Sequence, residues 1–155
     1  MKNRRSIYLI LHNIRSAENV GALFRTADFA GVSKIILVGT TPTPVDRFGR
    51  KRIDIHKSAL GAESFVSWEY KRLIIPLLNS MKLEGFQTIS IEQSLAALDY
   101  KKVKTKKKVA FIVGNEVAGL PKSVLDRSDI VAEIPKRGKK ESLNVSTAAG
   151  IALFR

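Results

Sequence analysis

The hydrophobic positions of this sequence fall into short unbroken runs that are rich in β-branched residues and bounded by glycine or polar residues. Runs of this kind are typical of strands that are buried on both faces of a parallel sheet. They predict four strands, near residues 7–11, 35–38, 88–91 and 109–113. A fifth strand is expected near residues 130–134, and residues 65–68 are a weaker sixth candidate.

Helical periodicity lies between the predicted strands. The clearest apolar stripe, which ends at Gly31, consists of Val20, Leu23, Phe24, Ala27 and Ala30. Further helices are expected near residues 71–82, 121–127 and 145–154, and residues 40–54 form the longest predicted loop. Strands that alternate with helices predict an α/β fold with three layers around a parallel sheet, formed as a single domain over residues 1–155.

Composition argues against several kinds of site and segment. The chain has no cysteine, which rules out disulfides and thiolate metal ligands, and its two histidines are isolated, so we expect no metal centre. No apolar stretch is long enough to cross a membrane, and the basic N-terminus shows no cleavage signal. We therefore expect a soluble, cytoplasmic protein.

The charge balance points to an anionic partner. The chain has 27 basic and 14 acidic residues, a net charge of +13, and basic domains bind phosphate backbones by counterion release. Nucleic acid is the first candidate, although such an excess can also serve solubility alone. The basic residues gather in three places: Arg47, Arg50, Lys51 and Arg52; Lys136, Arg137, Lys139 and Lys140; and Lys101, Lys102, Lys104, Lys106, Lys107 and Lys108. The first two would form an RNA-binding surface if the fold brings them to one face, whereas a lysine run is usually a solvated loop.

The segment HNIRSAENVGALFRTADFAG holds the first candidate site residues. Asn19 stands where a helix N-cap is expected. Gly21 and Arg25 are four residues apart and share a helix face, so the missing side chain would leave space beside the guanidinium group. The alternative is an ordinary N-cap followed by a surface arginine that pairs with Asp28.

The segment VAFIVGNEVAGLP places Gly114, Asn115, Glu116 and Gly119 directly after a predicted strand. Glycines at the carboxyl end of a strand let a ligand approach the backbone closely, which is where open α/β sheets bind nucleotides. The segment has neither the lysine and spacing of a P-loop nor a GxGxxG pattern, so ATP and NAD are disfavoured.

The segment EIPKRGKKESLNVSTAAGIALF combines a strand end, a basic loop and a helix with small residues. Ser142, Leu143 and Asn144 precede that helix, and its Ala148, Ala149 and Gly150 allow very close packing. Taken alone, the segment could also be an N-cap serine followed by a plain buried helix.

In this order, NVGALFR, IVGNEVAGLP and IPKRGKKESLNVSTAAGIALF resemble the three motifs of the SpoU (TrmH-like) family in the SPOUT superfamily, across residues 7–154. The resemblance implies an S-adenosylmethionine-dependent RNA methyltransferase that modifies a ribose 2′-hydroxyl in tRNA or rRNA. It also implies a deep C-terminal trefoil knot, which general folding rules would not suggest. A homodimer is expected, in which the cofactor lies in the knot and the partner chain helps to complete the active site.

The resemblance assigns roles to residues at the matching positions. The cofactor would contact Gly114, Ile134 and Leu143 largely through their backbone, with Ile91 and Glu92 as further contacts and Asn115, Ser142 and Asn144 shaping the pocket. Arg25 is the family's candidate base, or more safely a group that grips the substrate phosphate, since arginine stays protonated. Asn19, Glu116, Ser142 and Asn144 would hold the reacting groups in position. Arg47, Arg50, Lys51, Arg52, Lys136 and Arg137 are the candidate RNA-binding residues.

Two other functions remain open at this point. One is a catalytically silent RNA-binding protein that keeps the SPOUT fold, which the presence of Asn19, Arg25, Glu116, Ser142 and Asn144 argues against. The other is base methylation by another SPOUT branch, which the NVGALFR segment argues against. The sequence favours neither tRNA nor rRNA decisively.

Overall fold

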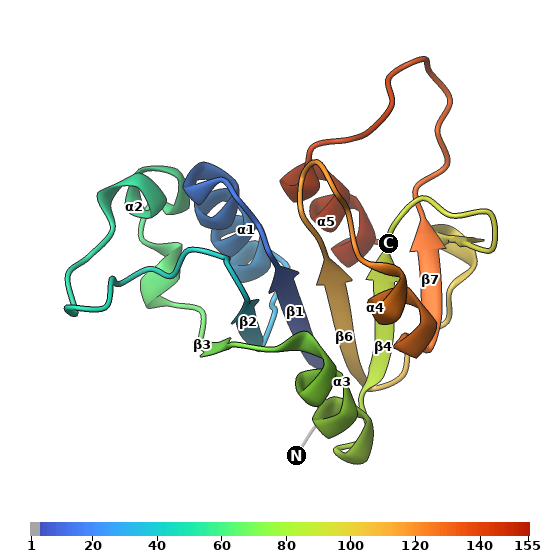
Figure 1. Cartoon of the computed structure of the whole chain (residues 1–155), viewed down its shortest axis with the longest axis horizontal. Coiled ribbons are helices and arrows are strands. Elements are labelled where there is room, and N and C mark those ends of the chain that lie inside the picture. The colour runs from blue at the N-terminus through green and yellow to red at the C-terminus, as the bar shows by residue number, and fades with distance from the viewer. Residues whose placement is uncertain (1–3) are drawn as a thin grey trace.

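A seven-stranded sheet, in which every strand runs parallel to its neighbours, organises the chain (Figure 1). The computed structural model describes residues 4–155. The strands are β1 (Ser6–His12), β2 (Lys34–Val38), β3 (Trp68–Lys71), β4 (Gln87–Ile91), β5 (Leu98–Asp99), β6 (Lys108–Val113) and β7 (Ile130–Glu133). Their order across the sheet is β3-β2-β1-β6-β4-β7-β5. The direction in which the chain builds the sheet therefore reverses at the boundary between β1 and β6.

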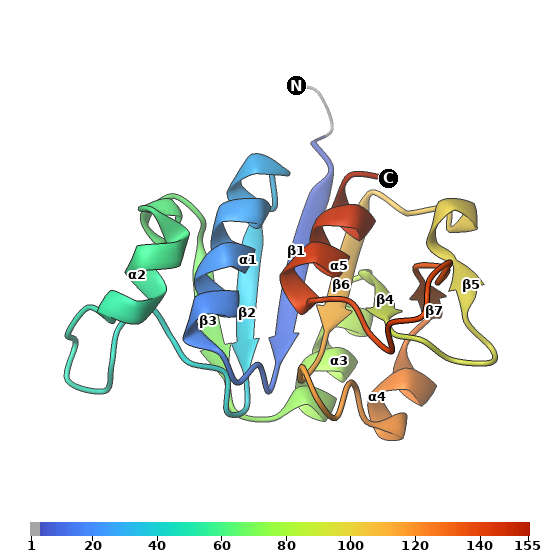
Figure 2. The ribbon, with the colours of Figure 1, turned by 90° about the horizontal axis from the view of Figure 1, so that it is seen from above.

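Helices cover both faces of this sheet, which confirms the predicted α/β architecture. They are α1 (Ala17–Phe29), α2 (Ile53–Ala59), α3 (Ile74–Leu83), α4 (Lys122–Arg127) and α5 (Val145–Leu153), with short 3-10 helices η1 (Ala62–Ser64) and η2 (Tyr100–Lys102). On one face α1 and α5 pack side by side, with α2 against α1, while α3 and α4 lie on the other (Figures 1 and 2). This division follows from right-handed crossovers, because β1, β2 and β3 extend the sheet in one direction and the later strands extend it in the other.

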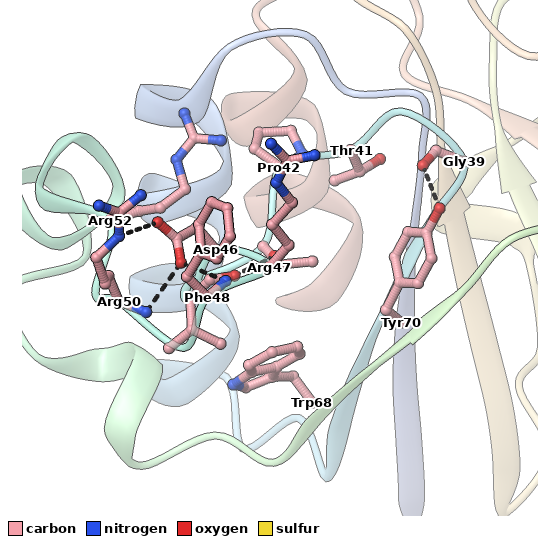
Figure 3. Close-up of a pocket in the computed structure, with 12 residues that line it drawn as sticks. Gly39, Thr41, Pro42, Asp46, Arg47, Phe48, Arg50, Arg52, Trp68 and Tyr70 are labelled. Carbon is pink, nitrogen blue, oxygen red and sulfur yellow. Dashed lines mark hydrogen bonds and ion pairs between the residues drawn. The ribbon is translucent and has the colours of Figure 1, made fainter.

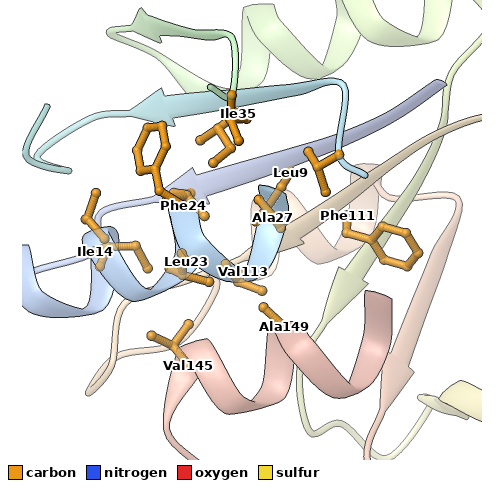
Figure 4. Close-up of a cluster of buried hydrophobic side chains, with 14 of the residues drawn as sticks. Leu9, Ile14, Leu23, Phe24, Ala27, Ile35, Phe111, Val113, Val145 and Ala149 are labelled. Carbon is orange, nitrogen blue, oxygen red and sulfur yellow. The ribbon is translucent and has the colours of Figure 1, made fainter. Parts of the chain in front are cut away.

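The central strands β1, β2 and β6 contain unbroken apolar runs because both of their faces are buried. In β1, Leu9 and Leu11 are fully buried under α1 and α5, whereas Ile10 is fully buried in a separate cluster on the α3 side. Figure 4 shows the first cluster, in which Phe24 of α1 and Ala149 of α5 point toward the strands. The apolar stripe predicted for α1 therefore faces the sheet as expected.

The beginning of α1 differs from the prediction. Ser16, and not Asn19, is the N-cap: its Oγ accepts a hydrogen bond of 3.1 Å from the backbone amide of Asn19. The assignment of Asn19 as the N-cap was wrong because a serine one turn earlier already satisfies that amide. Asn19 lies inside the helix, and its side chain is available for contacts with other segments.

The expected space beside Gly21 is also filled. A Cβ at Gly21 would overlap the side chain of Ser58 and the carbonyl oxygen of Ile55, both in α2. Gly21 therefore permits close packing of α1 against α2, and the prediction that it leaves room for the Arg25 guanidinium was wrong.

Several boundaries and two elements were mispredicted. The strand expected at residues 65–68 lies at Trp68–Lys71, because Phe65 belongs to the turn after η1 and is 76% exposed. The helix expected from residue 71 begins at Ile74, and the predicted loop 40–54 gives way to α2 at Ile53. Neither α2 nor the two-residue strand β5 was predicted.

Residues 4–155 contain neither a helix that could span a membrane nor a cluster of side chains that could hold a metal ion. No helix there is long and apolar enough to cross a membrane, and the longest helix with an apolar face, α1, has 13 residues. The same part of the chain contains no group of three or more histidine and carboxylate side chains placed to hold a metal ion.

Candidate active site

A pocket of about 360 Å³ opens at the carboxyl edge of the sheet, where β4, β6 and β7 end. It lies beside the point at which the building direction of the sheet reverses, the usual ligand site of open α/β sheets. Residues from the second and third motif segments line it together with the end of β4. Of the eight residues predicted to contact the cofactor, seven line this pocket: Ile91, Glu92, Gly114, Asn115, Ile134, Ser142 and Leu143. The eighth, Asn144, lies at the adjacent N-terminus of α5.

The turn after β6 forms one wall of the pocket from backbone. The side-chain oxygen of Asn115 accepts hydrogen bonds from the amides of Val117 at 2.9 Å and Ala118 at 2.8 Å, and the Gly119 amide bonds to the Asn115 carbonyl at 2.9 Å. A Cβ at Gly114 would come within 2.8 Å of both Gly119 and Leu120. The glycine therefore lets the turn fold back tightly, which leaves backbone groups facing the pocket.

Glu92 holds this turn against the end of β4. Its Oε2 accepts a hydrogen bond of 2.9 Å from the Leu120 amide, and its Oε1 accepts one of 3.1 Å from the Gln93 amide. Gly119 has a left-handed backbone with φ of +69°, and a Cβ there would lie 2.5 Å from Glu92 Oε2. Glu92 is thus a pocket residue whose carboxylate already serves to position the pocket wall.

Three of the predicted catalytic side chains form one hydrogen-bonded chain. Asn144 donates from Nδ2 to Oδ1 of Asn19 at 3.1 Å, and Asn19 donates from Nδ2 to Oε1 of Glu116 at 3.0 Å. Asn144 is also the N-cap of α5, where its Oδ1 accepts from the amides of Ser146 and Thr147. These hydrogen bonds link the three motif segments, although Asn19 and Asn144 are 125 residues apart in the sequence.

Glu116 is the centre of this arrangement. Its carboxylate also accepts hydrogen bonds from the backbone amides of Arg15 at 2.9 Å and Ser16 at 3.1 Å, next to the N-terminus of α1. Burial alone would raise the pKa of Glu116, but the hydrogen bonds from Arg15, Asn19 and Ser16 outweigh it and lower the pKa below its ordinary value. Glu116 is therefore ionised at neutral pH and is a weak proton acceptor.

Within a single copy of the protein, Arg25 lies apart from Asn19, Glu116 and Asn144. It lies six residues beyond Asn19 along α1, is exposed, and lines a separate cavity of about 410 Å³ with Ala22, Phe29 and Phe154. Among residues 4–155 it forms no ion pair with Asp28 or any other carboxylate. The structure thus places the candidate base or phosphate ligand outside its own chain's pocket.

No histidine lines the pocket in the described part of the chain, so its polar side chains include no imidazole that could act as a base. Ser142 lines the pocket and is exposed. Neither of the two histidines, both in the described part of the chain, lines it. His12 is 8% exposed, its Nδ1 has no hydrogen-bond partner, and burial lowers its pKa. His56 lies in α2, where its Nδ1 is 2.5 Å from Glu63 Oε1.

Two of the three basic clusters share the edge that carries the pocket. The cluster from Arg47 to Arg52 follows β2, and the cluster from Lys136 to Lys140 follows β7, so both lie beyond carboxyl ends of parallel strands. Lys136 and Arg137 are exposed. The lysine run, by contrast, precedes β6 and reaches its amino end at Lys108, on the opposite edge of the sheet.

Sequence reasoning missed several residues of this edge. Ser16 and Asn13 were not singled out, although Asn13 accepts hydrogen bonds from the Thr40 amide at 3.0 Å through its side chain and from Asn115 Nδ2 at 2.9 Å through its carbonyl. Neither Trp68 nor Tyr70 was singled out as a site residue: Trp68 was predicted only as the end of the weakest strand, and Tyr70 fell outside it. A Ser followed by Ala and Glu before an apolar stripe was the one available signal for the Ser16 cap.

Known proteins resemble this chain over nearly its whole length. The 23S rRNA (guanosine(2553)-2′-O)-methyltransferase RlmP of Bacillus subtilis is 30% identical over 146 residues, which are 94% of this chain and 56% of that protein. The 23S rRNA (guanosine-2′-O-)-methyltransferase RlmB of Xylella fastidiosa is 31% identical over 156 residues, covering 96% of this chain and 57% of that protein. The AdoMet-bound rRNA methyltransferase from Sinorhizobium meliloti has a TM-score of 0.88 and 30% identity, over 97% of this chain and 55% of that chain.

The chain therefore spans little more than half the length of these relatives. The sequence model of the SpoU rRNA methylase family matches residues 6–154, which include every strand and helix from β1 to α5. The matched range also contains all three motif segments that surround the pocket. The chain belongs to the SpoU rRNA methylase family.

Proposed function

We propose that this chain binds S-adenosylmethionine in the pocket at the carboxyl edge and transfers its methyl group to a ribose 2′-hydroxyl of tRNA or rRNA. The observation that carries the proposal is the convergence of the second and third motif segments, tied to the first by hydrogen bonds, around one pocket of about 360 Å³. The names of the relatives support it, since two are rRNA 2′-O-methyltransferases and the solved one has AdoMet bound.

The pocket suits an adenosine in size and chemistry. Its volume lies within the roughly 300–1,000 Å³ usual for small-ligand sites. Apolar side chains of Ile91, Ile134 and Leu143 line the pocket together with the polar turn after β6, a combination that fits a flat, polar-edged base. We assign contacts with the adenine and ribose to Gly114, Ile134 and Leu143, with Ile91, Glu92, Asn115, Ser142 and Asn144 shaping the rest of the site.

The bound cofactor would supply a methyl group carried on a positively charged sulfur. The methyl group would pass to the ribose oxygen, the sulfur would leave as a neutral thioether, and the hydroxyl proton would pass to the substrate phosphate or to water. Alignment contributes much of the rate of such a displacement. Arg25 would bind the neighbouring phosphate and stabilise negative charge on the ribose oxygen, because a guanidinium does not give up its proton below about pH 12.

We further propose that the protein is a homodimer in which Arg25 of one chain completes the pocket of the other. The cavity around Arg25 is open and bordered by two exposed aromatic rings, Phe29 at 85% and Phe154 at 56% exposure, whose centroids are 5.9 Å apart. Exposed aromatic side chains on the shared surface of α1 and α5 are what a second copy would cover. Arg25 would then leave its own chain and point into the partner's site.

A trefoil knot is the proposed route of the C-terminal segment. After β7 the chain returns to pack α5 against α1, although β4 and β6 lie between β7 and β1 in the sheet. The segment therefore passes over the carboxyl ends of those strands, close to the turns that follow them (Figure 2). A crystal structure whose backbone would remain knotted if both termini were pulled apart would support this route. A backbone that would pull out straight would refute it.

The RNA surface is proposed along the same edge. Arg47, Arg50, Lys51 and Arg52 on one side of the pocket and Lys136 and Arg137 on the other would follow the phosphate backbone. A tRNA or rRNA substrate would place the protein in the cytoplasm.

The reaction is tested by incubating the full chain with methyl-labelled S-adenosylmethionine and either total tRNA or rRNA, followed by nuclease digestion and mass spectrometry. The expected product is a labelled 2′-O-methylnucleoside from one RNA class, lost in the Arg25→Ala variant. Label on a base would refute ribose methylation, and tight cofactor binding without transfer to either RNA would favour a silent RNA-binding protein.

Sharing of the active site is tested by mixing two inactive variants. Arg25→Ala removes the guanidinium, and Ala148→Phe fills part of the cofactor pocket from α5. If Arg25 acts in the partner's pocket, co-expressed mixed dimers should recover up to about half of the wild-type activity per dimer, because one intact pocket faces one intact arginine. No recovery from a mixed dimer confirmed by mass spectrometry would refute the shared site.

A further inference from the structure

A second open cleft, of about 700 Å³, lies on the same edge of the sheet between the loop that follows β2 and the edge strand β3 (Figure 3). It is separate from the cofactor pocket and shares no lining residue with it. Three aromatic and three arginine side chains give it its character: Phe48, Trp68, Tyr70, Arg47, Arg50 and Arg52.

The aromatic rings present flat faces to this cleft. Trp68 and Tyr70 are two residues apart in β3 and therefore point to the same side of the sheet, toward the loop. Tyr70 is 46% exposed and Phe48 is 66% exposed, so both rings keep much of their area in contact with water. Aromatic surface left open in a concave site is suited to stacking against another flat ring.

The loop is held in place by Asp46. Its carboxylate accepts hydrogen bonds from the amides of Phe48 at 2.8 Å and Arg50 at 2.9 Å, and from the Arg50 side chain at 2.9 Å. Backbone hydrogen bonds from Arg50 to Asp46 lower the pKa of Asp46 despite some desolvation, so the carboxylate stays charged at neutral pH. The guanidinium carbons of Arg47 and Arg50 lie 4.8 Å and 5.0 Å from the centroid of the Phe48 ring.

Positive charge in the cleft exceeds negative charge. Asp46 neutralises Arg50, and Asp54 neutralises Arg52 at 2.7 Å, but Arg47 has no carboxylate partner among residues 4–155. Lys51 is exposed beside them. A site that combines open aromatic faces with a guanidinium available to a phosphate matches the chemistry of a single-stranded nucleotide.

We propose that this cleft binds one unstacked base of the RNA, next to the nucleotide that is methylated. The base would stack on the rings of Phe48 and Tyr70, with Trp68 at the base of the cleft, while Arg47 binds a flanking phosphate. This inference rests on the proposed function for the presence of an RNA substrate.

The cleft is connected to the cofactor pocket by a short series of hydrogen bonds. The Tyr70 hydroxyl donates to the Gly39 carbonyl at 2.8 Å, and the adjacent Thr40 amide donates to Asn13. Asn13 in turn accepts from Asn115 of the cofactor pocket at 2.9 Å. Three strand spacings separate β3 from β6, about 14 Å, which a few nucleotides of extended RNA can span.

Trp68 is the only tryptophan of the chain, so its fluorescence reports on the cleft directly. We expect short oligoadenylate to quench this fluorescence, and an abasic oligomer with the same number of phosphates to quench it much less. Phe48→Ala and Tyr70→Leu should each weaken oligoadenylate binding about 5- to 100-fold, the range for loss of one base stack. S-adenosylmethionine affinity should stay unchanged in both variants.

Matched controls separate stacking from other effects. Tyr70→Phe keeps the ring but removes the hydrogen bond to Gly39, and Phe65→Ala removes an exposed ring that lies outside the cleft. Both should bind oligoadenylate within about twofold of wild type. Unchanged affinity in Phe48→Ala and Tyr70→Leu, or equal binding of the abasic oligomer, would overturn the proposal.

Failure of the methyl-transfer proposal and failure of the base-site proposal give different experimental results. If no RNA is methylated but oligoadenylate still quenches Trp68 and the stacking variants still weaken it, the base site stands and the methyl-transfer proposal fails. If methylation proceeds while the stacking variants change neither RNA affinity nor rate, the methyl-transfer proposal stands and the base site fails.

Discussion

Replacement of Glu116 by glutamine tests whether this carboxylate holds the three motif segments together. The carboxylate accepts hydrogen bonds from Arg15, Ser16 and Asn19 at 2.9–3.1 Å. In Glu116→Gln one acceptor oxygen becomes an amino group that faces N–H donors, and the negative charge beside the N-terminus of α1 is lost. Hydrogen bonds to a charged group contribute about 1.5–3 kcal/mol, and partial exposure of Glu116 reduces this through solvent screening.

We therefore expect Glu116→Gln to lower the free energy of unfolding by about 1–2 kcal/mol at pH 7. For a domain of this length that corresponds to a fall in Tm of about 2–8 °C. The variant should be compared with wild type by urea unfolding followed by circular dichroism. Glu141→Gln is the matched control, because Glu141 also lines the pocket but is exposed, and its one ion pair among residues 4–155 is with the exposed Lys140. Its effect should stay below about 0.5 kcal/mol.

The pH dependence provides a second check on Glu116. Its pKa in the folded chain is lower than the ordinary 4.5, so its contribution to stability is complete above about pH 4.5 and is lost as pH falls through the folded value. The stability difference between wild type and Glu116→Gln should therefore shrink in acid. A difference that is absent at pH 7, or equal at pH 7 and in acid, would refute the argument from these hydrogen bonds.

Other predictions follow from packing and capping. Gly21→Val should destabilise the fold by about 1–3 kcal/mol in urea unfolding, because its side chain would meet Ser58 of α2. Leu9→Ala, at a fully buried site in β1, should cost about 2–5 kcal/mol by the same measurement. Asn144→Ala should cost about 1 kcal/mol through loss of the α5 cap, whereas Asn144→Asp keeps the acceptor and should retain most of that stability. The methyl-transfer rate, measured from pH 6 to 8, should show no inflection near pH 6.5, about the pKa of a free imidazole, because neither histidine lines the pocket.

The central strands were predictable because burial on both faces leaves an unmistakable pattern. β1, β2 and β6 lie inside the sheet and each contains an unbroken apolar run, while in β4, also inside the sheet, the buried Thr88 and Ser90 alternate with isoleucines. β3 and β5 lie at the two edges, where only one neighbour exists. In β3, Trp68 and Tyr70 alternate with Glu69 and Lys71, so the apolar run that precedes them, at Phe65 and Val66, drew the prediction three residues too early.

Helix α2 could not be predicted from the hydrophobic pattern, because few of its residues are buried. It buries only Ile55 and Ala59, and its flanking apolar residues Ile53 and Leu60 are 67% and 65% exposed. Seven residues with two buried positions give no helical stripe long enough to distinguish from a loop. Its contact with α1 depends on Gly21, and a missing side chain carries no periodic signal.

The sequence predicted those pocket residues that lie in or next to one of the three motif segments. Gly114, Ile134 and Leu143 were placed by resemblance, and the structure brings them to one cavity. Arg25 was grouped with them because the motifs were read as one site, yet in the folded chain it faces another cavity. A linear motif specifies which residues act together without specifying whether they belong to the same copy of the chain.

The hydrogen bonds that link Asn19, Glu116 and Asn144 bear on the proposal that a second copy of the chain supplies the arginine. Each of these side chains uses its oxygen atoms on a donor from the protein: Glu116 on amides and Asn19, Asn19 on Asn144, and Asn144 on the first turn of α5. Such a network fixes the pocket before a ligand arrives, which favours alignment, and its hydrogen bonds make Glu116 a weak proton acceptor. This arrangement supports the proposal that the three residues act by position and that Arg25 of a second copy stabilises charge at the ribose.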